Sequence, residues 1–149
     1  MIQLRGALKD ELSTLNELCL RSKAVWGYDD AFMTACRVEL TLRPDELQST
    51  HIQVAERDFI VVGFAQVKVS GTDADLLKLF VEPALLRSGV GRLLFNWATA
   101  MARRLGAARM IIERPRRCSL LRAYGRTIRG LRSFPIYSWT NAAAYADGV

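Results

Sequence analysis

Asp75-Leu-Leu-Lys-Leu-Phe-Val-Glu-Pro-Ala-Leu-Leu-Arg-Ser-Gly-Val-Gly-Arg92 is the stretch from which the fold of this chain can be predicted. Its apolar residues up to Val81, interrupted only by Lys78, predict a buried strand, which the following Glu-Pro pair ends. Residues 87–92 then form a short glycine-rich loop, and a helix begins directly after it. Glycines let the backbone approach a ligand, and a helix start has free N–H groups. The stretch therefore favours a phosphate-binding site.

The helix after this loop is expected at about residues 90–105, with Gly106 at its C-terminal end. Apolar residues at helical spacing predict one broad buried face on it. These residues are Leu93, Leu94, Trp97, Met101 and Leu105.

The elements on either side of this stretch alternate between strand and helix patterns. We expect strands at 2–4, 51–56, 59–69, 75–82 and 110–112, and helices at about 8–22 and 30–40. A tight turn near Arg57 joins the second and third strands, and Gly63 within the third is typical of a bulge. The order predicts an α/β fold with a mixed, mostly antiparallel central sheet and helices on both faces. The length of 149 residues fits a single domain.

The charge of the chain is unevenly distributed. The net charge of +6 comes entirely from residues 114–149, which hold seven arginines and one acidic residue, Asp147. Residues 1–113 hold 14 basic and 14 acidic residues. The hypothesis of nucleic-acid binding therefore depends on the tail alone. Its arginines could contact a nucleic-acid backbone, and its aromatic residues could stack on bases, namely Tyr124, Phe134, Tyr137 and Trp139.

Cysteine and histidine usage argues against a metal centre. There are three widely spaced cysteines and one histidine, His51, which is expected to be an ordinary strand or loop residue. No Cys-x-x-Cys pair is present, so a structural zinc site is not expected. No secretion signal or membrane-spanning apolar run is found, so we expect reduced thiols and a cytoplasmic protein with no membrane partner.

Residues 1–113 resemble the GCN5-related N-acetyltransferase (GNAT) superfamily. The likeness is carried by the Leu79-Phe-Val-Glu-Pro83 strand end, by Gly89-Val-Gly-Arg-Leu-Leu94 after it, and by the element order. The family's loop pattern is Gln/Arg-x-x-Gly-x-Gly/Ala, and Leu86 occupies the Gln/Arg position, where it departs from the pattern. A segment from Leu20 to Asp29 also resembles one bacterial subgroup, which adds no substrate.

The resemblance implies acetyl-coenzyme A as co-substrate, with no metal. The backbone of the strand would pair with the pantetheine arm, and the loop would hold the diphosphate. The residues implied are Leu79, Phe80 and Val81 for pantetheine and Arg87, Ser88, Gly89, Val90, Gly91 and Arg92 for the diphosphate. The family attaches acetyl groups to primary amines by direct attack on the thioester, and homodimers are common in it. The alternative for the loop is an ordinary turn that binds nothing.

Candidates for the acceptor side of the site are few. Trp26, Tyr28 and Phe32 could line an acceptor pocket or could simply pack two helices together. Asp75 and Glu82 are carboxylates that could act as a general base, although strand-end carboxylates are commonly solvated. Lys78 is expected to be a surface residue of its strand. A small molecule, a peptide N-terminus and a lysine side chain all stay open as the acceptor.

Residues 114–149 do not match the family, which has a helix with a thiolate-protonating tyrosine here and then two closing strands. One choice of codons, translated one base later from Arg114, gives Asp-Pro-Gly-Ala-Ala-Pro-Phe-Tyr-Glu-Arg-Met-Gly, which resembles the missing motif. A second re-read segment, from Trp139, resembles a closing strand. We therefore hypothesise a frame-shifted tail that packs poorly and lacks the acid tyrosine, which Tyr124 could replace only by accident. An acetyl-coenzyme A binder with weak or no catalysis is the alternative function.

Overall fold

The computed structural model describes residues 1–24, 30–112 and 132–135, in which six strands form one sheet with the spatial order β1 to β6. The strands are β1 Gln3–Gly6, β2 His51–Arg57, β3 Ile60–Ser70, β4 Asp73–Val81, β5 Arg109–Ile112 and β6 Arg132–Pro135. Every neighbouring pair is antiparallel except β4 and β5, which are parallel. The predicted mixed, mostly antiparallel sheet is therefore confirmed, whereas β6 lies in the tail, for which no strand was predicted.

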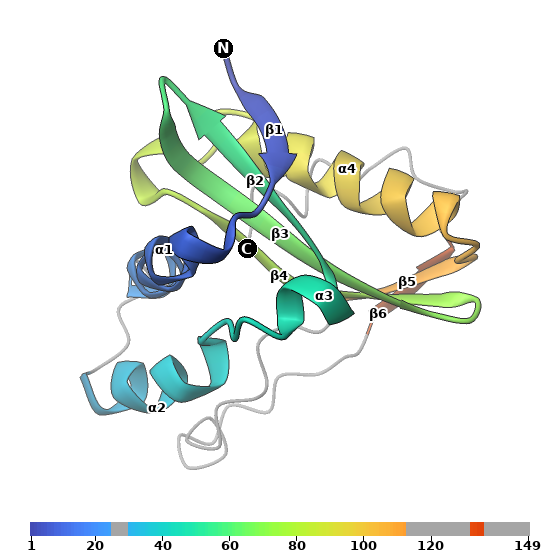
Figure 1. The fold of residues 1–149 in the computed structure, drawn as a ribbon, viewed down its shortest axis with the longest axis horizontal. Coiled ribbons are helices and arrows are strands. Elements are labelled where there is room, and N and C mark those ends of the chain that lie inside the picture. The colour runs from blue at the N-terminus through green and yellow to red at the C-terminus, as the bar shows by residue number, and fades with distance from the viewer. Residues whose placement is uncertain (25–29, 113–131, 136–149) are drawn as a thin grey trace.

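Helices lie on both faces of the sheet, as predicted (Figure 1). One face carries α1 Leu12–Ala24, α2 Asp30–Leu40 and α3 Glu46–Ser49, and the other carries α4 Val90–Arg104. Short 3-10 turns, η1 Lys9–Glu11 and η2 Pro83–Leu85, precede α1 and α4. No helix was predicted at the four residues of α3, because one helical turn is too short to show a period.

Alternation along the central strands divides the core between the two faces. Val54 and Phe64 pack with Leu15 and Leu18 of α1, whereas their neighbours in sequence, such as Ala65, pack with α4. Such alternation is what a strand covered on both sides requires. The sheet is thus fixed between two hydrophobic layers, which leaves its ends for the site.

The buried face of α4 differs from the sequence prediction. Leu94 is buried as expected, but Leu93 and Leu105 are 41% and 43% exposed. The buried positions are Val90, Gly91, Leu94, Phe95, Ala98 and Ala102. Small residues form much of this face. The face predicted from the large apolar side chains is therefore turned partly away from the sheet.

Gly63 is a point of close contact between α4 and the sheet. A Cβ atom built on it would lie 2.9 Å from the Phe80 carbonyl oxygen and 3.0 Å from Leu94 Cδ1. The predicted bulge lies beside it, because Ala55 pairs with Gly63 and the next residue of β2 pairs with Val61. The close packing of helix and strand therefore requires a glycine here, beside the irregular register.

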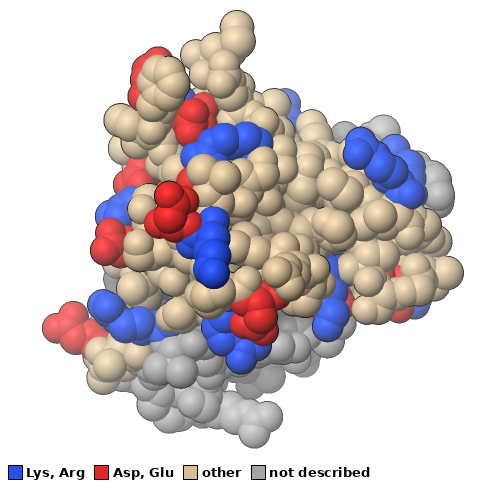
Figure 2. Space-filling model, viewed as in Figure 1, with Lys and Arg blue, Asp and Glu red and all other residues tan. Residues whose placement is uncertain are grey.

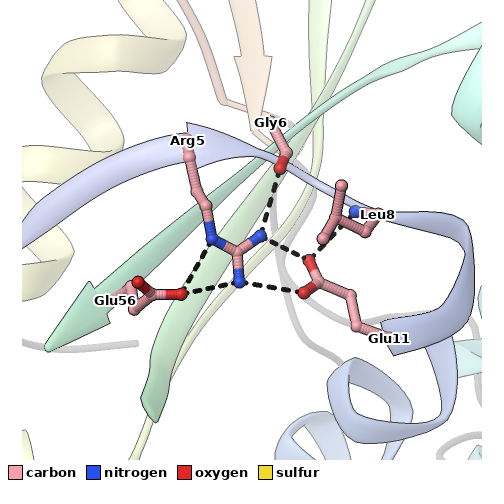
Figure 3. Close-up of polar contacts among 5 residues, drawn as sticks. All are labelled: Arg5, Gly6, Leu8, Glu11 and Glu56. Atoms are coloured by element: carbon pink, nitrogen blue, oxygen red, sulfur yellow. Dashed lines mark hydrogen bonds and ion pairs between the residues drawn. The ribbon is translucent and has the colours of Figure 1, made fainter. Parts of the chain in front are cut away.

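A charged cluster fixes the short first strand (Figure 3). The Arg5 guanidinium donates to both carboxylate oxygens of Glu11 at 2.9 Å and, through Nε, to Glu56 at 2.8 Å. Glu11 also accepts a hydrogen bond from the Leu8 N–H at 3.0 Å. These bonds, first of all those to Glu11, raise the pKa of Arg5. The cluster joins β1, η1 and β2 where only four residues of strand pairing hold β1.

Cys19 is fully buried in α1, and burial raises the pKa of its thiol to about 12. We expect a Cys36→Ser/Cys118→Ser variant to react with a disulfide reagent only as fast as the protein unfolds, because the thiolate is the reactive form. The folded state holds this thiol neutral up to a pKa of about 12, whereas in the unfolded chain it ionises near 9. The free energy of unfolding should therefore fall as the pH rises from about 9 towards 12. Rapid labelling of the native protein at pH 8 would contradict this.

Candidate active site

β4 has a half-open edge, which is the central feature of the site. Its residues pair with β3 along the strand, but they pair with β5 only from Asp73 to Leu76. A bulge follows at Leu77, because Gln66 pairs with Lys78 and the next residue of β3 pairs with Leu76. Within the described part of the chain, residues 77–81 therefore have no strand partner on the β5 side. Sequence reasoning missed the bulge.

The direction of the backbone groups along this edge follows from one hydrogen bond. The N–H of Glu82 donates to the Val62 oxygen of β3 at 2.7 Å. Because N–H and C=O groups alternate between the edges of an antiparallel strand, Phe80 also directs its groups towards β3. Leu79 and Val81 then direct theirs towards the open edge. These groups can hydrogen-bond an extended ligand lying between β4 and β5.

The loop after β4 is a compact double turn. The Leu85 N–H donates to the Glu82 oxygen at 2.8 Å, and the Ser88 N–H and hydroxyl both donate to the Leu85 oxygen. Arg87 and Gly89 have φ values of 66° and 93°. This left-handed conformation is ordinary for glycine and costs an arginine about 1–2 kcal/mol. The backbone of residues 87–89 thus turns sharply before α4 begins.

The start of α4 and this loop together are the candidate anion site. The first intrahelical bond runs from the Leu93 N–H to the Gly89 oxygen at 3.1 Å, so the N–H groups of residues 89–92 precede the helical ladder. The exposed Arg87 and Arg92 add positive charge. Leu86, which departs from the family pattern, is half-buried against the core cluster on the α4 side. It therefore contributes packing where the pattern has a polar side chain.

Lys78 lies at the inner end of the open edge, directly after the bulge. It is half-buried rather than a surface residue, which corrects the sequence interpretation. Burial lowers the pKa of its ammonium, and Glu46 of α3 opposes that shift. Opposite it, Gln66 is fully buried and donates to the Thr50 hydroxyl at 3.0 Å. No hydrogen bond or ion pair of Lys78 is found among the described residues.

Glu82 ends β4 and forms an ion pair with Arg21 from the last turn of α1. The guanidinium donates twice, from Nη2 to Oε2 at 2.8 Å and from Nε to Oε1 at 3.3 Å. This bonding raises the pKa of Arg21. The carboxylate, considered as a general base from the sequence, is therefore engaged in a salt bridge.

The remaining sequence candidates are not all brought together. Asp75 is half-buried and lies where β4 is still paired with β5, opposite Ile111. Trp26, Tyr28 and Tyr124 lie outside the described residues, and of Phe32 only the position in α2 is described. A cavity of about 250 Å³ opens between α1 and α2, and Asp75 is not among its described lining residues.

Two further findings concern partners. In the described ranges, no three histidine, cysteine or acidic side chains are grouped as metal ligands, and no helix is long and apolar enough to cross a membrane. Figure 2 shows basic and acidic residues interspersed over the face in view, where the described residues form no continuous basic patch. That distribution gives no support to nucleic-acid binding.

Comparisons with solved structures show the same fold. The chain is 19% identical to PaiA N-acetyltransferase from Thermoplasma acidophilum in complex with coenzyme A (TM-score 0.70, covering 84% of this chain and 86% of that chain). It is 17% identical to the ribosomal-protein-S18-alanine N-acetyltransferase from Escherichia coli (TM-score 0.58, 84% and 75%). It is 20% identical to yncA from Salmonella typhimurium with its cofactor acetyl-CoA (TM-score 0.55, 75% and 69%).

No curated protein sequence matches the chain. The model of the Acetyltransferase (GNAT) family matches residues 12–125, which is well over half of the chain and extends twelve residues past the boundary drawn from the sequence. This match, together with the mixed sheet and the helices on both of its faces, assigns the chain to a family. The chain belongs to the GNAT family of acetyltransferases.

Proposed function

We propose that this protein transfers the acetyl group of acetyl-CoA to a primary amine by direct attack. The observation that carries the proposal is the half-open edge of β4, which leads towards the start of α4, where we place the anion site. Backbone groups of Leu79 and Val81 would bind the pantetheine arm, as an added strand would. The loop from Arg87 to Arg92 would bind the diphosphate.

The chemistry requires orientation and two proton transfers. The amine nitrogen attacks the thioester carbonyl carbon, a C–N bond forms and the C–S bond breaks. The amine gives up a proton to a base, and the departing thiolate gains one to form coenzyme A. Asp75 is our candidate for the base and Tyr124 for the acid. Trp26, Tyr28 and Phe32 are the candidates for the acceptor pocket.

The test is an acetyl-CoA-dependent screen of small amines, peptide N-termini and lysine peptides, with thiol release as the readout. We expect acetyl-CoA to bind in the micromolar to millimolar range typical of enzyme substrates and at least one amine class to be acetylated. Binding without turnover of any amine would favour the alternative, an acetyl-CoA binder without catalysis. No binding of acetyl-CoA would overturn the proposal.

A second arm of the screen concerns the tail. A version in which residues 114–149 are replaced by the re-read sequence should be more active, because it regains the tyrosine that the family places near the thiolate. Sequencing the gene tests the origin of the tail directly, since other codons at these positions would exclude a shifted frame.

A further inference from the structure

We propose that Arg21 positions the cofactor electrostatically: by binding the Glu82 carboxylate, it removes a negative charge from beside the diphosphate site. Arg21 is then a positioning residue that need not touch the cofactor. The inference rests on the proposed function, because it requires that the loop before α4 bind the diphosphate of acetyl-CoA.

The first step is the distance between Glu82 and the loop. Two hydrogen-bonded turns connect them, from Glu82 to Leu85 and from Leu85 to Ser88. Each such turn spans less than about 7 Å between Cα atoms, so the Cα atoms of Glu82 and Ser88 are at most about 14 Å apart. That range is comparable to the screening length of about 10 Å at 0.1 M salt. An unpaired carboxylate at residue 82 would therefore make the electrostatic potential at the loop more negative.

The second step is the sign of that influence. An uncompensated carboxylate repels the diphosphate that the loop and the start of α4 attract. Arg21 provides the opposite charge in a two-bond geometry, at 2.8 and 3.3 Å, which suits guanidinium and carboxylate groups. Glu82 is the largest cause of the raised pKa of Arg21, so the guanidinium keeps its positive charge beside the carboxylate.

The third step is the position of Arg21 and a matched control pair. Arg21 belongs to α1, 61 residues away in sequence, and reaches the last residue before the 3-10 turn that begins the loop. A comparable pair, Arg109 with Asp73, lies at the other end of β4 with a closest distance of 3.2 Å. It offers a matched control, because both pairs join separate elements and both arginines are about half exposed.

The experiment is a charge cycle on the full chain, with Arg21→Gln, Glu82→Gln, the double variant and the control Arg109→Gln. Affinity for acetyl-CoA is measured by calorimetry at low and high salt, and stability by urea denaturation. We expect Arg21→Gln to weaken binding about fivefold at low salt, the scale of a unit-charge repulsion at this range. Glu82→Gln should not weaken binding, and the double variant should return close to wild type. Arg109→Gln should bind as wild type does.

Each other outcome overturns the inference. If the double variant binds as weakly as Arg21→Gln, Arg21 contacts the cofactor directly. If both single variants weaken binding and stability equally, the pair only joins α1 to β4. An effect that persists at 1 M salt would also contradict a screened charge. If wild type fails to bind acetyl-CoA, the proposed function fails and this inference with it, which distinguishes that failure from the others.

Discussion

Replacing Gly89 by alanine is expected to weaken acetyl-CoA binding about tenfold. Gly89 has a φ of 93°, and an L-residue held in the left-handed region loses about 1–2 kcal/mol. The variant loop can relieve this strain by turning its N–H groups out of the anion site. Binding of acetyl-CoA must then restore the strained loop conformation, and this cost is subtracted from the binding free energy. A cost of about 1.4 kcal/mol corresponds to a tenfold loss of affinity. Calorimetric titration with acetyl-CoA measures it.

Gly106 supplies the matched control at the other end of the same helix. Its φ is 92°, and, as at Gly89, nothing lies within 4 Å of a Cβ built on it. Gly106→Ala should therefore suffer the same backbone strain and a similar loss of stability without a change in acetyl-CoA affinity. If the two variants lose stability alike and both bind as wild type does, the loop is not the diphosphate site.

Replacing Gly63 by alanine is expected to lower the free energy of unfolding by about 1–3 kcal/mol, the usual cost of overpacking a core. The new methyl group would lie 2.9 Å from the Phe80 oxygen, a backbone atom that cannot move without displacing β4. Leu94 and Val90 of α4 close the space from the other side. Urea denaturation measures the loss.

Gly6 in β1 is the corresponding control, because a Cβ atom there meets nothing within 4 Å. Gly6→Ala should change stability by no more than about 0.5 kcal/mol, as most surface substitutions do. Equal stabilities of the Gly63→Ala and Gly6→Ala variants would show that α4 can move away from the sheet at little cost.

The strand, loop and helix between Asp75 and Arg92 were predictable because each element carries its own local signal. An apolar run predicts a buried strand, and glycines before a helix predict a sharp turn, as the left-handed Gly89 confirms. The four-residue strand pairing of β5 and the short β1 were found for the same reason, with boundaries shifted by one or two residues.

Features that depend on three-dimensional register were not predictable. The bulge at Leu77 arises from how β4 pairs with β3, and it is what places Lys78 against α1 rather than in solvent. The pair of Arg21 and Glu82 joins residues that no sequence period relates. The face of α4 was misassigned because Ala98 and Ala102 carry weak hydrophobic signals although both are fully buried.

The half-open edge of β4 also bears on how the protein avoids aggregation. Unpaired strand edges ordinarily recruit strands from other chains. Among the described residues, 77–81 of β4 have no strand partner on the β5 side, and this length begins at a bulge, so it offers only a short edge of backbone. A narrow ligand arm fits such an opening, whereas a second polypeptide would need a longer straight edge. The geometry that we propose to admit the cofactor would therefore also discourage strand addition by neighbouring molecules.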